Sequence, residues 1–235
     1  MTLLFLHPVG LDAHSTEWLD IPELRAVTFP GHGARARART GLRLEDMADE
    51  IVGWTTGPLD VVGASLGGMV ALHLALQHPS RVRSLVLSCT TAAGDPEVMR
   101  SRADATAERG SAGMLDETLT RWFTADALAR KPLDPQVAYA RDRLIAADAG
   151  ALADTWRAIA GHDVRDRLPE IQAPTTCVAG LVDVSTPLSV MTELAEGLPH
   201  ARLVTMDAPH MAFLEKPGEF SDIVRSHLRW VGSVA

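Results

Sequence analysis

Residues 59–77 read LDVVGASLGGMVALHLALQ, and this stretch decides the fold. The apolar run at 59–62 predicts a buried strand, and residues 69–77 predict a helix. Between them, residues 63–67 follow the pattern Gly-x-Ser-x-Gly, in which a serine is held in a sharp strand-to-helix turn. Small residues are needed on both sides of that serine because bulky ones would collide with neighbouring backbone. The stretch therefore predicts that Ser65 is a nucleophile at the end of a strand.

Short apolar runs alternate with longer helix-like segments on both sides of this stretch. Such alternation is typical of parallel strands joined by crossover helices, and continuous apolar runs indicate a sheet that is covered on both faces. The expected class is α/β, with a mostly parallel sheet of six strands: Leu3–Leu6, Leu24–Phe29, Leu59–Val62, Val82–Ser88, Thr175–Val178 and Ala201–Thr205. The helices expected around it are Leu44–Trp54, Met69–Gln77, Pro187–Glu196 and Pro217–Trp230.

The strand pattern stops over residues 94–168, where apolar residues recur at helical spacing, as at Leu115, Leu119, Trp122 and Phe123. This segment is expected to be a helical insertion carried by the sheet. The sheet domain would then consist of residues 1–93 and 169–235. A chain of 235 residues has room for one domain with an insertion of this size.

The composition argues against several classes of protein. A formal net charge of -8 repels phosphate backbones, so no nucleic acid is expected as a partner. Two cysteines, Cys89 and Cys177, lie in apolar runs and are too few for a disulfide scaffold, which favours a reducing compartment. No segment has the run of about 20 apolar residues that a membrane span requires, and the N-terminus lacks the features of a signal peptide. We expect a cytoplasmic protein with no membrane partner.

A serine hydroxyl needs a histidine base and a group that orients the histidine. The chain order for this architecture is serine, acid, histidine. Asp183 and His210 each follow one of the last two predicted strands, at the strand ends where open parallel sheets place their ligand sites. We therefore expect Ser65, Asp183 and His210 to come together. Asp95 stays open as an alternative acid, whereas Asp207 is expected to form a turn.

Acyl transfer also needs two backbone N–H donors for the oxyanion of the tetrahedral intermediate. One is expected from Leu66, directly after the nucleophile. The other is expected from the loop at residues 6–10, which follows the first strand, and Val9 is the residue chosen there.

Nucleotide and metal motifs are not matched. Ser65 occupies the second glycine position of a dinucleotide fingerprint, and Met69 stands where a phosphate loop needs lysine. No pair of histidines has the helix-face spacing of a zinc hydrolase. We expect neither a cofactor nor a metal.

Together these motifs resemble the α/β-hydrolase superfamily over essentially the whole chain: Pro30–Gly33, Gly63–Gly68, Ala179–Asp183 and Pro209–His210 occur in the familiar order. Within it, the chain most resembles 3-oxoadipate enol-lactonases, on residues 78–87, 121–124 and 158–167. The resemblance implies a cofactor-free serine hydrolase that acts on a small ester or lactone through an acyl-enzyme. Family members usually carry two further N-terminal strands, so six strands are expected here in place of eight.

The resemblance also implies that residues 94–168 form a cap over the active site. By analogy, Arg121 and Trp122 would bind a substrate that carries a carboxylate, which the planar fork of arginine pairs well. From the residues alone, Trp122 fits the apolar core equally well and Arg121 fits a solvated surface. The sequence also leaves open whether the protein forms a homodimer.

Other activities stay open as well, because fold alone does not separate them. The same triad would serve a carboxylesterase of the pimeloyl-methyl-ester type, a cofactor-free perhydrolase or a lyase. From another class, a non-catalytic small-molecule binding protein would keep the pocket without turnover. Dehalogenases and epoxide hydrolases are disfavoured because their nucleophile resembles an aspartate, and here it is Ser65.

Overall fold

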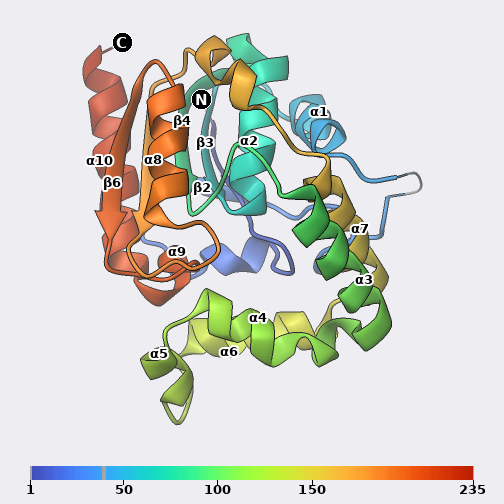
Figure 1. Ribbon diagram of the computed structural model, residues 1–235. Helices are drawn as coiled ribbons and strands as arrows, with labels where there is room; N and C mark the ends of the chain where they lie inside the picture. The colour runs from blue at the N-terminus through green and yellow to red at the C-terminus, as the bar shows by residue number, and fades with distance from the viewer. Residues whose placement is uncertain (1, 39–40, 235) are drawn as a thin grey trace.

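The computed structural model describes residues 2–38 and 41–234, and at its centre is one six-stranded sheet (Figure 1). Every pair of neighbouring strands is parallel. The strand order is β2-β1-β3-β4-β5-β6, with the bounds β1 Thr2–Leu6, β2 Leu24–Val27, β3 Leu59–Ala64, β4 Val82–Ser88, β5 Thr175–Gly180 and β6 Ala201–Met206. The predicted α/β class with six strands is confirmed.

Each face of the sheet has its own apolar core, because successive side chains of a strand point to opposite faces. Leu4 and Leu6 of β1 pack on one face, and Phe5 packs on the other. The first face is covered by α1 (Leu44–Trp54), α2 (Leu66–Gln77) and α8 (Leu188–Gly197), and the second by α9 (Ala212–Glu215) and α10 (Pro217–Val234). Burial on both faces explains why the strands read as continuous apolar runs.

Helix α2 begins at Leu66, earlier than the predicted start at Met69. Glycine is a poor helix former, and the predicted helix therefore began only after Gly67 and Gly68. The structure explains the pair by close packing: a Cβ on Gly67 would lie 1.9 Å from the carbonyl oxygen of Leu6. Gly67 therefore allows the first turn of α2 to lie directly against β1, and Gly68 makes room for Thr90, whose Oγ1 would lie 2.6 Å from a Cβ there.

Strand β2 ends at Val27, whereas the sequence predicts that it continues to Phe29. The Phe29 N–H leaves the sheet and donates to His7 Nε2 at 3.0 Å. Burial, reinforced by the nearby His32, lowers the pKa of His7 to about 3. His7 is therefore neutral at ordinary pH and keeps the lone pair that this bond requires.

Further helices lie between β4 and β5, in residues 94–168: α3 (Pro96–Gly113), α4 (Leu115–Trp122), α5 (Ala125–Ala129), α6 (Pro135–Ala146) and α7 (Ala149–Ala160). We call residues 94–168 the helical segment. Helix α3 packs along α7, while α4, α5 and α6 lie below the sheet in Figure 1. Trp122 of α4 and Leu144 of α6 join the core on the second face of the sheet. Short 3-10 helices occur at Ala13–Thr16, Pro79–Arg81 and Arg165–Glu170.

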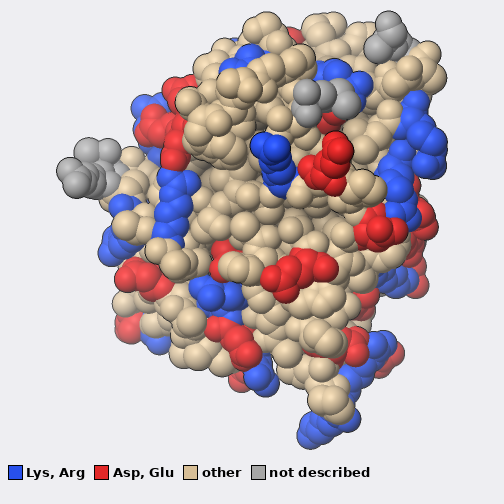
Figure 2. All heavy atoms as spheres, turned by 180° about the vertical axis from the view of Figure 1, so that it is seen from behind, with Lys and Arg blue, Asp and Glu red and all other residues tan. Residues whose placement is uncertain are grey.

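The surface carries acidic and basic side chains side by side. On the face shown in Figure 2, they are interspersed around a central area of uncharged side chains. None of the helices that the structure describes is both long and apolar enough to cross a membrane.

Both cysteines are buried, as the apolar runs around them predict. Cys89 and Cys177 are free thiols. Burial raises the pKa of each to about 12, which keeps them protonated and unreactive at neutral pH.

Candidate active site

Ser65 lies at the junction of β3 and α2 in a strained backbone conformation. Its φ is 51° and its ψ is -116°, a combination that residues other than glycine rarely adopt. The Ser65 N–H donates to the Ser88 carbonyl at 2.9 Å, and the Thr90 hydroxyl donates to the Ser65 carbonyl at 2.7 Å. A Cβ on Gly63 would lie 2.5 Å from the Gly67 carbonyl oxygen. Both glycines of the motif are therefore needed for the tight turn that holds the Ser65 side chain.

Side chains from three separate loops form a row of hydrogen bonds at this turn. His210 Nε2 lies 3.0 Å from Ser65 Oγ, and His210 Nδ1 lies 2.8 Å from Asp183 Oδ2. Asp183 follows β5 and His210 follows β6, and these strands run parallel to β3 in the same sheet. The structure thus brings together the three residues that the chain order predicts to meet.

The Asp183 carboxylate is surrounded by hydrogen-bond donors. The N–H groups of Ser185 and Thr186 donate to Oδ1 at 2.7 and 3.1 Å, and the Thr186 hydroxyl donates to Oδ2 at 2.6 Å. Burial alone would raise the pKa of Asp183, but the bonds from His210 and Thr186 outweigh it and lower the pKa to about 2. Asp183 is therefore charged at neutral pH and can stabilise a positive charge on His210.

The other two acids considered from the sequence have different partners. Asp95 Oδ1 accepts the first free backbone N–H groups of α3 at 3.0 Å and caps that helix. Asp207 is exposed and forms an ion pair with Lys216 at 3.5 Å. The geometry places Asp183, rather than either of these acids, against His210.

A cavity of about 250 Å³ opens beside Ser65 and His210. This volume lies below the roughly 300–1,000 Å³ of pockets that hold drug-sized ligands, so the cavity suits a small molecule. From the helical segment its wall receives two arginines and two tryptophans: Arg102, Arg121, Trp122 and Trp156. Within residues 2–38 and 41–234, no group of three or more His, Cys, Asp or Glu side chains is placed to hold a metal ion.

The two residues predicted to donate backbone N–H groups both lie at Ser65. Leu66 is the first residue of α2, where N–H groups have no intrahelical acceptor. Val9 lies in the loop after β1 and lines the same cavity as Ser65.

Arg121 and Trp122 both line the cavity as well. Trp122 is only 4% exposed and packs in the core of the second sheet face, while it also lines the cavity. It therefore occupies both positions that the sequence left open, the apolar core and the cavity wall. Arg121 is half-buried, and burial lowers its pKa. Arg102 and Trp156 were missed, because no local motif marks them: α3 is polar on most of its surface, and its arginines look alike in sequence.

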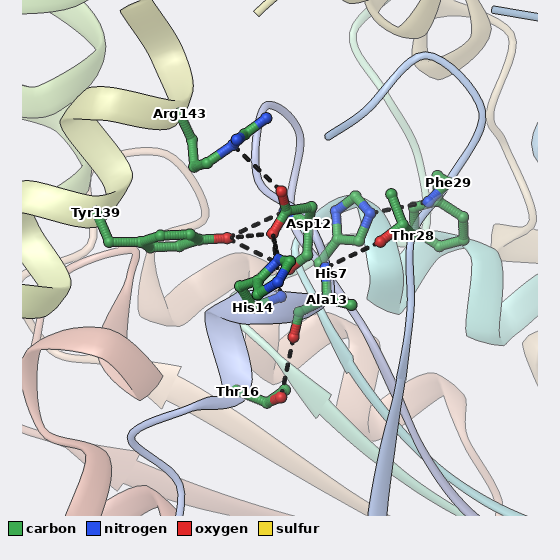
Figure 3. Close-up of polar contacts among 9 residues, drawn as sticks. All are labelled: His7, Asp12, Ala13, His14, Thr16, Thr28, Phe29, Tyr139 and Arg143. Carbon is green, nitrogen blue, oxygen red and sulfur yellow. Dashed lines mark hydrogen bonds and ion pairs between the residues drawn. The ribbon is translucent and has the colours of Figure 1, made fainter. Parts of the chain in front are cut away.

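The loop that carries Val9 is fastened to the helical segment by a buried carboxylate, Asp12 (Figure 3). The Tyr139 hydroxyl donates to Asp12 Oδ1 at 2.8 Å, and Arg143 Nε lies 3.2 Å from Asp12 Oδ2. Burial would raise the pKa of Asp12, but the bonds from Tyr139 and His14, with the charge of Arg143, lower it instead. We call Asp12, Tyr139 and Arg143 the Asp12 anchor.

Replacing Tyr139 with phenylalanine is expected to lower the free energy of unfolding by about 1.5–3 kcal/mol, the range for a hydrogen bond to a charged group. Urea unfolding measures this loss. In an Asp12→Asn background the same replacement should cost less, because its charged acceptor is gone. Equal losses in the two backgrounds would show that the Tyr139 hydroxyl acts through the Asp12 backbone N–H, which donates to it at 3.2 Å, and not through the Asp12 carboxylate.

A parallel sheet with a Gly-x-Ser-x-Gly turn after one strand and a histidine after the last defines the class of α/β hydrolases. The model of the family described as "alpha/beta hydrolase fold" matches residues 55–217, more than half of the chain. The chain belongs to this family.

The chain is similar to named hydrolases along most of its length. It is 30% identical to a pimeloyl-[acyl-carrier protein] methyl ester esterase of Nitrosomonas europaea, over 93% of this chain and 92% of that one. It is 26% identical to 3-oxoadipate enol-lactonase 2 of Acinetobacter baylyi, over 85% and 76%. Among solved structures, an enol-lactonase from Burkholderia xenovorans LB400 matches with a TM-score of 0.91 and 26% identity, over 97% and 90%. These relatives are named as ester and lactone hydrolases.

Proposed function

We propose that this protein is a cofactor-free serine hydrolase that cleaves a small carboxylic ester or lactone through an acyl-enzyme. One observation carries the proposal: the hydrogen-bonded row from Asp183 through His210 ends at Ser65 Oγ, in the wall of the cavity. A hydroxyl in that position has both a base and a place for a carbonyl group. The hydrolase names of the relatives support the same reaction type.

In the proposed mechanism, Asp183 accepts the Nδ1–H of His210 and so leaves the lone pair on Nε2. Nε2 takes the proton of Ser65 as Oγ attacks the carbonyl carbon, and Asp183 stabilises the resulting imidazolium. His210 then returns the proton to the departing alcohol oxygen. A water molecule, deprotonated by the same nitrogen, releases the acid and restores the Ser65 hydroxyl.

The oxyanion formed in both steps would be held by the N–H groups of Val9 and Leu66. Each such donor is worth about 10²- to 10³-fold in turnover in enzymes of this kind. The helical segment would act as a cap that closes the cavity over the sheet domain of residues 1–93 and 169–235. Arg121 and Trp122 of that cap would contact the substrate, and Arg121 would favour an anionic one.

Two substrate classes fit this mechanism. The likeness to the Burkholderia xenovorans enol-lactonase favours a lactone. The 30% identity to the Nitrosomonas europaea esterase supports a methyl ester as the second candidate. Rates measured on an enol-lactone and on methyl esters of equal acyl length distinguish them: turnover of esters without turnover of lactones would select the second candidate.

Incubation with a fluorophosphonate is expected to label Ser65, because these reagents react with activated serine hydroxyls. Peptide mapping locates the label, and Ser65→Ala should remove it. Ser80→Ala changes an exposed serine in the turn Pro79–Arg81 and should leave labelling intact. Labelling of a serine other than Ser65 would overturn the proposed nucleophile.

A further inference from the structure

The loop that carries Val9 has its two ends held by the chain that directly follows β2. Before Val9, His7 Nε2 accepts the Phe29 N–H at 3.0 Å. After Val9, the Ala13 N–H donates to the Thr28 hydroxyl at 3.1 Å. Both attachments belong to the sheet domain, so they leave only the middle of the loop to be held by something else.

The middle of this loop is held by helix α6 of the helical segment (Figure 3). Gly10 has a φ of 77° and packs so closely on α6 that a Cβ there would lie 2.8 Å from Leu144 Cδ2. Tyr139 and Arg143 lie four residues apart on one face of α6, and both contact Asp12. The Tyr139 hydroxyl accepts the Asp12 N–H at 3.2 Å while it donates to the Asp12 carboxylate at 2.8 Å. It therefore binds the backbone of the loop as well as a side chain.

The Asp12 anchor is buried and charged, which fixes its geometry. Asp12 is only 3% exposed, and Arg143 Nε lies 3.2 Å from its Oδ2. Burial and the Asp12 carboxylate raise the pKa of Tyr139, so its hydroxyl keeps the proton that it donates. Separating the members of a buried ion pair leaves uncompensated charges, which is far more costly than at the surface. Asp12 therefore follows the position of α6.

The Val9 N–H lies three residues before Asp12, in the wall of the cavity. Within residues 2–38 and 41–234, this N–H donates to no acceptor, although Val9 is only 4% exposed. A buried N–H is normally paired, and one that faces a cavity is available to a ligand. An oxyanion donor must lie 2.7–3.1 Å from the charge that develops, so small movements of the loop matter.

We propose that α6 sets the position of the Val9 N–H through the Asp12 anchor, and that Asp12, Tyr139 and Arg143 are positioning residues for this oxyanion donor. Their role rests on the proposed function, in which the Val9 N–H binds the oxyanion. Movement of α6 away from the sheet domain would draw Asp12 with it and weaken the oxyanion site, while the bond between His210 and Ser65 stays intact. The helical segment then completes the catalytic machinery in addition to closing the cavity.

The test compares Arg143→Met with Arg141→Met, using p-nitrophenyl butyrate as the substrate. Arg141 lies on the same helix and pairs only with the adjacent Asp142, so its replacement removes the same charge without touching the anchor. In Arg143→Met, kcat per active site should fall about 10- to 100-fold, part of the 10²- to 10³-fold that a whole donor is worth. Arg141→Met should match the wild-type enzyme, and Arg143→Lys, which keeps the charge, should recover part of the loss.

A purely structural role for Arg143 predicts different kinetics. Acylation and deacylation both pass through an oxyanion, so a displaced donor slows both steps and leaves KM within about threefold of the wild-type value. The burst of p-nitrophenol counts the active sites. If Arg143→Met only unfolded part of the protein, the burst would shrink while the rate per active site stayed at the wild-type value.

A trifluoromethyl ketone reports on the oxyanion site directly. Ser65 Oγ bonds to the ketone carbon, the Oγ proton passes to His210 Nε2, and the electron pair of the C=O double bond moves onto oxygen to form the oxyanion. The affinity of Arg143→Met for this ketone should fall by the same factor as kcat/KM. Tyr139→Phe, which keeps the ring, should show the same pattern and serves in its place if Arg143→Met does not fold.

The outcomes separate this proposal from the proposed function. If folded Arg143→Met and Tyr139→Phe keep the wild-type kcat per active site, or if Arg141→Met loses as much as Arg143→Met, the anchor does not position Val9 and the hydrolase proposal stands. The same holds if kcat/KM falls while the ketone binds as tightly as before. If the wild-type protein hydrolyses no p-nitrophenyl ester and Ser65 is not labelled by a fluorophosphonate, the proposed function itself fails.

Discussion

The Ser65→Ala variant is expected to hydrolyse its best ester with a kcat about 10⁵- to 10⁶-fold below that of the wild-type enzyme, the scale seen when a triad nucleophile is removed. The Ser65 hydroxyl lies 3.0 Å from His210 Nε2, and alanine leaves no oxygen there to attack the carbonyl carbon. The substrate should still bind to this variant, because the rest of the cavity wall, including Arg102 and Arg121, is unchanged. A burst of p-nitrophenol, which reports acylation, should disappear together with steady-state turnover.

Stability is the necessary companion measurement. Serine and alanine face the same strain at a φ of 51°, so the free energy of unfolding should change by no more than about 1 kcal/mol. Ser80→Ala, at an exposed turn, should match the wild-type enzyme in both turnover and stability. If a folded Ser65→Ala variant kept more than about a hundredth of the wild-type rate, the nucleophile would have to be assigned elsewhere.

The sheet and the row of hydrogen bonds could be predicted because each depends on local sequence. A strand buried on both faces shows as an apolar run, and the Gly-x-Ser-x-Gly turn fixes where Ser65 stands relative to β3. Asp183 and His210 could then be placed without knowing any contact, since parallel strands bring their carboxyl ends to one edge. Errors occurred where close packing overrode propensity, as at Gly67, or where a side chain replaced a sheet partner, as His7 does for Phe29.

The wall of the cavity could not be predicted in the same way. Which residues of a helical segment face a cavity depends on how its helices pack, and α3 has too little amphipathic pattern to reveal its inner side. Arg100, Arg102 and Arg109 are equivalent in sequence, yet one is exposed, one lines the cavity and one pairs with Glu117. The link between Asp12 and Tyr139 joins residues 127 positions apart, and spacing alone carries no trace of it.

The Asp183→Asn variant is expected to lower kcat about 10⁴-fold, the loss known for this replacement in a triad of the same geometry. An asparagine amide can donate a hydrogen bond to His210 Nδ1, which moves the ring proton to Nε2 and removes the acceptor for the Ser65 hydroxyl. It also removes the charge that stabilises the imidazolium. Asp207→Asn changes an exposed acid three residues before His210 and should leave kcat unchanged.

The same variant should show a stability difference that depends on pH. The pKa of Asp183 falls from 3.8 to about 2 on folding, so its charged form stabilises the native state above about pH 4, and that contribution is lost as the pH falls toward 2. The wild-type protein should therefore be more stable than Asp183→Asn at pH 6, with a difference that shrinks between about pH 4 and pH 2. Urea unfolding of both proteins at matched pH measures this difference in the free energy of unfolding. Groups that titrate equally in the two proteins do not contribute to the difference. A difference that stays constant down to pH 2 would mean that the Asp183 charge is not what holds His210 in place, and the role of Asp183 in the triad would have to be abandoned.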